Sequence, residues 1–303
     1  MVKDTELEKT ARKRGSVDDF ERDWQEALSG NLQRYLIYPA DKPTTQFELF
    51  EHIKAEYVSE SLKASKLQNG IVLEYGCGAA GMSAYLAARG FRVVACDLSF
   101  NALRLANINA QQHLAPDTLQ QFHSVAANTF QLPFSDEAFD VVMSYGLLEH
   151  FAPEALDSVL VEVVRTLRPG GLFVADIAHG RFSSRQVGAW ISLATSLLFH
   201  FITLRWQKLE GLPGAYLKHY YENDLDEQAW GQALKRADLS AVQVRIYHPF
   251  PPLALSGWPE KLYVALMQWA HPVWQWFDRA QPRWGRFWGW LYIADGIKAQ
   301  RHN

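Results

Sequence analysis

The sequence predicts an α/β protein whose core is a doubly wound, mostly parallel seven-stranded sheet. Three observations lead there: short apolar runs recur along the chain, helical patterns separate most of them, and a glycine-rich turn follows the first run. Strands that alternate with helices imply a parallel sheet covered on both faces. The predicted strands span 71–74, 91–96, 122–127, 140–145, 172–176, 241–247 and 288–299.

The helices between these strands have recognisable starts and stops. Residues 82–89 read as a helix that Gly90 ends, and Ser99 can cap a helix that continues to about Gln111. Pro153 suits the first turn of the next helix. A turn at 169–171 and a helix at 224–237 complete the alternation. Before the first strand, residues 1–30 read as a charged, partly helical arm, and 31–68 carry apolar residues at helical spacing.

This pattern divides the 303 residues into a core and additions to it. About half of the chain is apolar, which is enough to bury a full core. We expect six segments: an N-terminal helical arm and cap at 1–68, a cofactor-binding core at 69–180, an apolar insertion acting as a lid at 181–223, a core helix and strand at 224–250, a Trp-rich insertion at 251–287, and the last core strand with a tail at 288–303.

The glycine-rich turn carries the first chemical signal. Gly76, Gly78 and Gly81 have the G-x-G-x-x-G spacing, which lets the chain turn sharply and lets a ligand approach the backbone. Nicotinamide-binding folds use the same turn, so the glycines alone do not select a cofactor. The carboxylate of Glu74 would repel a pyrophosphate and attract a ligand that carries an ammonium and a sulfonium. Asp97 ends the second strand and can accept hydrogen bonds from the ribose hydroxyls of either cofactor.

Four blocks follow in a fixed order and complete the signal. They are Leu-Pro-Phe at 132–134, Phe-Asp-Val-Val at 139–142, Leu-Leu-Glu-His at 147–150 and Leu-Arg-Pro-Gly-Gly at 167–171. With the glycine turn, this set resembles the class I methyltransferases that use S-adenosylmethionine (SAM), in particular the ubiquinone/menaquinone-type and small-molecule branch. The resemblance covers about residues 70–176 and implies a Rossmann-like fold, methyltransferase activity and SAM as cofactor.

The resemblance also implies cofactor-binding roles for particular residues. Glu74, Gly76, Cys77, Gly78 and Gly81 would surround the methionine part of SAM. Asp97 would bind the ribose, Leu98 would flank the adenine, and Tyr145 would complete the cofactor site. Thr129 would present its backbone N–H to the ring. The family usually has an aspartate where this chain has Asn128, whose carbonyl can still accept from the adenine amino group, without charge assistance.

The transfer needs little acid–base chemistry, since the sulfonium is already a strong electrophile, and a general base is required only if the acceptor must lose a proton. Tyr145, His150 and His179 follow the fourth and fifth strands, whose carboxyl ends face the ligand crevice in such sheets. They are the candidate catalytic residues, with a bracing role as the alternative for His150. Cys77 and Cys96 read as buried fillers, and no metal-ligand spacing is present.

The two insertions bear on the acceptor. Residues 187–204 contain no formally charged side chain, and seven of the eleven tryptophans lie between 258 and 290. Tryptophan beside Arg279, Arg283 and Arg286 is an interfacial composition. We expect the insertions to meet over an apolar small-molecule or lipid-like acceptor, with a membrane surface as a partner. A buried lid or a homodimer contact is the alternative, and a transmembrane span is disfavoured because it would interrupt one compact domain.

Composition sets the remaining expectations. The net charge of −3 and the absence of a basic stripe argue against nucleic acid as a partner. Two cysteines and a charged N-terminus without an apolar stretch predict a cytoplasmic protein, peripheral on the inner face of a membrane if the insertions meet lipid. The alternatives are a nucleic-acid methyltransferase, a nicotinamide oxidoreductase and a non-catalytic SAM-fold scaffold. The sequence leaves open whether oxygen, carbon or nitrogen is methylated.

Overall fold

The computed structural model describes residues 16–30, 32–204, 221–247 and 250–300. It contains the predicted seven-stranded sheet, and the structure gives its strand order as β3-β2-β1-β4-β5-β7-β6. The pairs among the first five strands are parallel, and β7 runs antiparallel to both β5 and β6. The strands are β1 (Ile71–Tyr75), β2 (Arg92–Asp97), β3 (Phe122–Ala126), β4 (Phe139–Tyr145), β5 (Leu167–Ala178), β6 (Leu239–Tyr247) and β7 (Leu291–Lys298).

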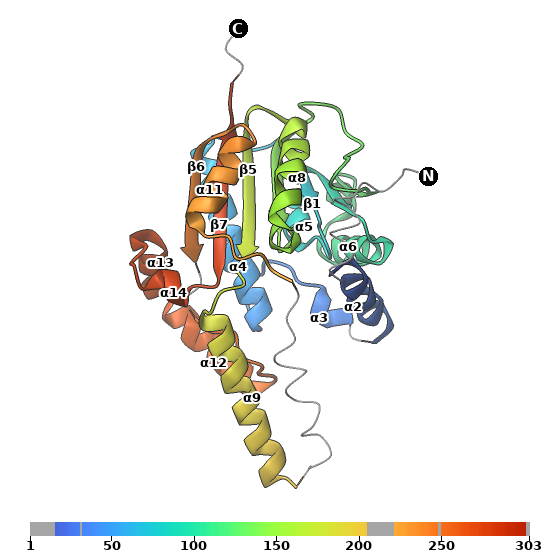
Figure 1. The fold of residues 1–303 in the computed structure, drawn as a ribbon. Coiled ribbons are helices and arrows are strands. Elements are labelled where there is room, and N and C mark those ends of the chain that lie inside the picture. Colours follow the sequence, from blue (N-terminus) through green and yellow to red (C-terminus); the bar gives the residue numbers. More distant parts are fainter. Residues whose placement is uncertain (1–15, 31, 205–220, 248–249, 301–303) are drawn as a thin grey trace.

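Helices cover both faces of the sheet (Figure 1). Neighbouring strand residues point to opposite faces, so Val72 belongs to one core cluster and Leu73 to the other. The first cluster includes α4 (Gln46–Ala64), α5 (Gly81–Ala87) and α6 (Phe100–His113). The second includes α8 (Pro153–Thr166) and α11 (Glu227–Arg236). The remaining helices are α2 (Ser16–Gly30), α3 (Leu32–Tyr35), α7 (Pro116–Leu119), the short 3-10 turn η1 (Leu148–His150), α9 (Ser184–Ile202), α12 (Trp258–Trp269), α13 (His271–Ala280) and α14 (Gly285–Trp288).

Local sequence explains several helix boundaries. Thr45 and Glu48 form a reciprocal capping box at the start of α4, and Ser99 caps α6 as expected. Asp226 caps α11, so this helix begins three residues later than predicted. The predicted turn at 169–171 lies inside β5 instead, because Leu167 already pairs with Phe139 and the register with β4 shifts just afterwards.

Strand order determines where a ligand can enter. The chain proceeds outward from β1 to β3 and then returns to β4 on the other side of β1, which places the topological switch between β1 and β4. Ligands of open α/β sheets bind in the crevice at the carboxyl ends of such strands. At that end β5 leads into α9, while β6 precedes the segment that contains α12, α13 and α14.

The two insertions contact each other near this edge. In α9, Gly188 lies so close to the Pro252 carbonyl that no Cβ would fit, and the Ala254 N–H donates to the Ser192 hydroxyl at 2.8 Å. Beyond this contact α9 extends away from the sheet (Figure 1). Among the described residues, no helix combines the length and apolar character needed to cross a bilayer. The part of the first predicted insertion at 205–220 lies outside the described residues.

Two glycines within helices provide a matched stability test. We expect Gly188→Ala to destabilise the protein by about 1–3 kcal/mol, because the added methyl displaces the Pro252 backbone. Gly231→Ala in α11 has its nearest neighbour, Val244 Cγ2, at 4.0 Å and should stabilise by up to ~1 kcal/mol through helix propensity. Urea denaturation measures both changes. Equal effects of the two substitutions would contradict the packing of α9 on the 252–254 segment.

Candidate functional site

A cavity of about 490 Å³ lies at the switch between β1 and β4. Its floor is the turn that follows β1, and its sides come from the ends of β2 and β4 and from the N-terminal helices. Every residue predicted to bind the cofactor is among the lining residues: Glu74, Gly76, Cys77, Gly78, Gly81, Asp97, Leu98, Asn128, Thr129 and Tyr145. Tertiary structure therefore gathers at one cavity the residues that sequence order spread over more than seventy positions.

The glycines of the turn are required by close packing. Gly76 has a φ of 65°, and a Cβ there would also overlap the Leu147 side chain. At Gly81, a Cβ would overlap the backbone carbonyl of Ile37. Asn109 reinforces this approach, since its amide donates to the Ile37 carbonyl at 3.0 Å and to the Ala79 carbonyl at 2.8 Å. The third glycine thus admits the N-terminal segment, a role that its spacing did not reveal.

Two carboxylates flank the turn and differ in their environment. Asp97 accepts from the backbone N–H of Gly78 at 3.0 Å and of Ser99 at 2.9 Å, and burial raises its pKa against these donors. Glu74 is buried and accepts from the N–H and the hydroxyl of Ser83 at 3.1 and 2.5 Å. Desolvation raises the pKa of Glu74 to about 8, although the Ser83 hydrogen bond opposes the shift.

One cation balances the acidic lining. Among the described lining residues, Glu21, Glu51, Glu74 and Asp97 are acidic and Lys54 alone is basic. The Lys54 ammonium lies 2.8 Å from Glu51 Oε1, 2.9 Å from Asp176 Oδ2 and 4.9 Å from the centre of the Tyr145 ring. Burial alone would lower the pKa of Lys54, but the two carboxylates outweigh burial and raise it. The cavity therefore keeps an excess of acidic groups and suits a cationic ligand.

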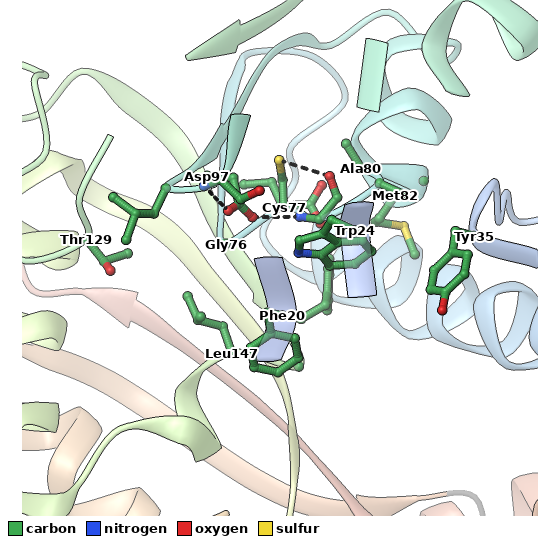
Figure 2. A pocket seen from close by; sticks show the side chains of 18 of the residues that line it. Phe20, Trp24, Tyr35, Gly76, Cys77, Ala80, Met82, Asp97, Thr129 and Leu147 are labelled. Atoms are coloured by element: carbon green, nitrogen blue, oxygen red, sulfur yellow. Dashed lines mark hydrogen bonds between the residues drawn. The ribbon is translucent and has the colours of Figure 1, made fainter. Parts of the chain in front are cut away.

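The N-terminal helices contribute lining residues that the sequence did not single out. Phe20, Trp24 and Tyr35 come from α2 and α3, and Glu51 and Lys54 come from α4. Trp24 lies against the glycine turn, with its ring 3.1 Å from the position of a Gly78 Cβ (Figure 2). The i, i+4 spacing of Phe20 and Trp24 on a predicted helical arm is the signal that could have identified this cover.

The three predicted catalytic candidates separate in the structure. Tyr145 lines the cavity, and its hydroxyl lies 3.5 Å from Met143 Sδ; burial raises its pKa well above the ordinary value, so the phenol stays protonated. His150 and His179 are not among the lining residues. Their ring nitrogens bond to the backbone carbonyls of Tyr221 and Gly289 at 2.7 and 2.8 Å, as bracing residues would. Burial lowers the pKa of both imidazoles.

The cavity is covered by the N-terminal helices and not by the described parts of the two insertions, which the sequence predicted to meet over the acceptor site. Among the described residues, none in α9 or in 251–287 lines the cavity, and the cover consists of α2, α3 and α4. The reason is geometric: α9 extends away from the sheet, whereas α2 packs on α6 beside the turn through Ala27 and Leu105, and Leu36, which follows α3, joins the same cluster. Cys77 and Cys96 are buried free thiols, and desolvation raises the pKa of each.

Glu149, behind the cavity, generates a pH prediction. Its Oε1 accepts from the Ala178 N–H at 3.0 Å, and desolvation raises its pKa from 4.5 to about 8. Between these pH values the folded protein holds a proton that the unfolded chain has lost, so stability falls as pH rises from 4.5 to 8. We expect the free energy of unfolding to fall less between pH 6 and pH 9 in Glu149→Gln than in the wild type. The difference should be roughly 1–3 kcal/mol.

Denaturant titrations at the two pH values measure this difference. Glu154→Gln, at an exposed position on α8, is the matched control and should leave the pH dependence of the wild type unchanged. A Glu149→Gln variant with the full pH dependence of the wild type would show that Glu149 titrates near its ordinary pKa.

Comparisons with known proteins agree with this geometry. Residues 73–175 match the model of a methyltransferase domain. A ubiquinone biosynthesis O-methyltransferase from Rickettsia typhi is 31% identical over 129 residues, 41% of this chain and 46% of that protein. A cyclopropane-fatty-acyl-phospholipid synthase from Escherichia coli is 24% identical over 205 residues, 62% of this chain and 50% of that protein. The chain spans about half the length of the curated relatives it matches.

A solved structure supports the fold. Magnesium protoporphyrin IX methyltransferase from Synechocystis, with S-adenosylhomocysteine (SAH) bound, superposes with a TM-score of 0.54 at 15% identity, covering 93% of this chain and 100% of that one. The match at 73–175 contains the glycine turn, Asp97 and the ordered blocks on which the resemblance depended. Residues 73–175 therefore match a methyltransferase domain, and this match disfavours the nicotinamide alternative.

Proposed function

We propose that the protein transfers a methyl group from SAM to an apolar small-molecule or lipid-like acceptor. The observation that carries this proposal is the acid-lined cavity at the carboxyl ends of β1 and β4, inside the matched domain. SAM brings an ammonium and a sulfonium. Among the described lining residues, Glu21, Glu51 and Asp97 face the single ammonium of Lys54, and Glu74 adds an acid that a bound cation would help to ionise. Opposite charges in a partly buried site attract strongly because water screens them poorly.

The lining residues suggest how the cofactor would lie. We assign the methionine part to Glu74 and the turn of Gly76, Cys77, Gly78 and Gly81, and the ribose hydroxyls to Asp97. Leu98 would flank the adenine ring, beside the backbone N–H of Thr129. Asn128 Oδ1 already accepts from the Phe130 N–H at 3.1 Å, and its second lone pair would accept from the adenine amino group.

The chemistry asks mainly for alignment. Bound SAM supplies an electrophilic methyl group; its bond to sulfur breaks as a bond to the acceptor forms, and SAH leaves. Phe20, Trp24 and Leu147 would exclude water around the sulfur, and Tyr145 would position the acceptor with a neutral hydroxyl. His150 and His179, held by backbone carbonyls outside the lining, are better suited to bracing than to proton abstraction. The atom that receives the methyl group stays undecided among oxygen, carbon and nitrogen.

Two observations favour an apolar acceptor. Aromatic side chains of Phe20, Trp24, Tyr35, Phe130 and Phe151 make up much of the lining. The Escherichia coli relative that aligns with 62% of this chain is named for the synthesis of cyclopropane fatty acyl phospholipids, which makes a lipid the acceptor of that protein. We propose a cytoplasmic enzyme that works at the inner face of a membrane, where such acceptors reside.

The segment boundaries are also a proposal. Residues 69–180 would bind the cofactor, and 224–250 with 288–303 would complete the core. The arm at 1–68 would cover the cavity, as the lining contributed by α2, α3 and α4 supports. The insertions at 181–223 and 251–287 would serve the acceptor side from the same edge of the sheet, without lining the cofactor cavity in their described parts.

The function is tested with SAM that carries a labelled methyl group and a cell lipid extract. We expect label to enter the organic-soluble fraction with the wild type. Asp97→Asn should weaken SAH binding at least tenfold, about 1.5 kcal/mol, because one charge-assisted acceptor is lost. The same variant should reduce labelling when SAM is limiting. Asp157→Asn, at a half-exposed position on α8, is the control. Calorimetry that finds unchanged SAH affinity in Asp97→Asn would overturn the ribose assignment, and wild-type protein that binds SAH but labels no fraction would favour the scaffold alternative.

Asn128 gives a graded test of adenine recognition. A carboxylate at this position adds charge assistance to the bond from the adenine amino group, whereas leucine removes the acceptor. The expected order of SAH affinity is therefore Asn128→Asp at or above wild type, then wild type, then Asn128→Leu. Calorimetric dissociation constants establish the order, and a leucine variant as tight as wild type would place the adenine elsewhere.

A further inference from the structure

The exposed apolar side chains of the protein are concentrated in the two insertions. Among the described residues, seventeen of the twenty-one exposed large hydrophobic side chains lie at 182–204 or 258–287. They include Trp258, Trp269 and Phe287, which are 75, 84 and 76% exposed. Surfaces of this kind on a soluble protein mark interaction sites. We call the exposed parts of α9, α12, α13 and α14 the apolar projection, because α9 and α12 extend from the carboxyl edge of the sheet (Figure 1).

The end of α9 distinguishes between a protein partner and an apolar phase. Leu197, Leu198 and Phe199 are consecutive and exposed, and Phe201 and Ile202 are exposed as well. At 100° per residue the first three alone cover an arc of about 200°. A helix that docks on a protein surface buries a narrower stripe, whereas a helix that is apolar over most of its circumference fits immersion in hydrocarbon. This geometry favours a lipid phase over a second copy of the chain.

The length of this apolar end fits a partial insertion. From Leu197 to Ile202 the helix rises by about 7.5 Å at 1.5 Å per residue. Interfacial helices place their apolar side chains about 5–10 Å into the boundary between headgroups and acyl chains. No described helix is able to cross a bilayer, so the end of α9 would enter one leaflet and stop there.

Charges around the projection complement anionic lipid. Within 251–287, the exposed charged residues are Lys261, Arg279, Arg283 and Arg286, all basic. The two acidic residues of this segment are turned inward: Asp278 is buried, and Glu260 accepts from the Gln46 N–H at 3.1 Å. Residues 186–204, which include α9 from its third residue onward, carry no formal charge at all. Tryptophan and arginine together at such a surface are typical of the region where headgroups meet acyl chains.

We propose that the apolar projection docks the protein on an anionic bilayer, with the end of α9 inserted and Arg279 and Arg283 at the headgroups. The projection leaves the carboxyl edge of the sheet, the same edge that holds the cavity between β1 and β4. Docking would therefore turn this edge of the sheet, with the cavity, toward the membrane surface. That this presents a lipid-like acceptor to the cavity rests on the proposed function; the docking itself does not.

Vesicle flotation of the full chain tests the proposal. One set of vesicles is pure phosphatidylcholine, and the other contains about 30% anionic phosphatidylglycerol. The comparison distinguishes binding by apolar insertion from binding by charge attraction. We expect the wild type to float with the anionic vesicles. The triple variant Phe199→Ser, Phe201→Ser, Ile202→Ser should lose at least tenfold in partitioning on both compositions. Arg279→Gln with Arg283→Gln should lose on the order of tenfold at low salt, on anionic vesicles only. Val161→Gln, an exposed apolar position on α8, should leave flotation unchanged.

The outcomes decide the matter independently of catalysis. Wild-type protein that stays with the soluble fraction on both vesicles, or a triple variant that floats like the wild type, overturns the proposal. A wild-type dimer in size-exclusion chromatography with light scattering, made monomeric by the triple variant and without vesicle binding, also overturns it and makes the projection a subunit contact. SAH calorimetry on the triple variant should match the wild type. If the wild type binds vesicles but not SAH, the proposed function fails and the docking surface stands.

Discussion

The arrangement of elements around the cavity depends on the partners of one buried carboxylate, that of Asp176. This carboxylate accepts from the Gly146 N–H at 2.6 Å, lies 2.9 Å from the Lys54 ammonium and is 3.3 Å from the Tyr247 hydroxyl. One side chain on β5 thus connects the end of β4, the helix α4 and the end of β6. A buried charge without partners would be costly. The positions of these elements around the cavity follow from meeting that requirement.

The balance between buried acidic groups and Lys54 also affects the protonation of the site. Lys54 neutralises part of the acidic group, while Glu74 and Glu149 are pushed by desolvation to pKa values of about 8. A cationic ligand beside Glu74 would favour its ionised form and lower that pKa. Cofactor binding and proton release should therefore be coupled near neutral pH, through the residue that begins the glycine turn. Asp97 differs from Glu74 in accepting hydrogen bonds from two backbone N–H groups.

The N-terminal helices line the cavity, whereas the insertions lie at the same edge of the sheet without lining it in their described parts. Helices α2, α3 and α4 supply aromatic and charged lining residues and approach the backbone at Gly81. The insertions contact each other at Gly188 and Ser192 but turn their large apolar side chains outward. A partly open cavity beside an exposed apolar projection would suit the proposed enzyme, whose acceptor is less soluble than its cofactor.

The sequence by itself determined the order of the strands along the chain, the glycine turn and the residues that flank it, because these depend on local periodicity and on spacing over a few residues. Asp97 and Tyr145 could be placed at the cavity because the carboxyl ends of parallel strands share one edge of a sheet, whereas Asn128 was placed there by the resemblance alone. Only the tertiary structure decided that Trp24 and Lys54 complete the lining, and that His150 and His179 bond to backbone carbonyls outside it. Those contacts join positions that are tens of residues or more apart, and local pattern carries no information about them. The direction of α9 was decided in the same way, by the packing of Gly188 on the Pro252 backbone.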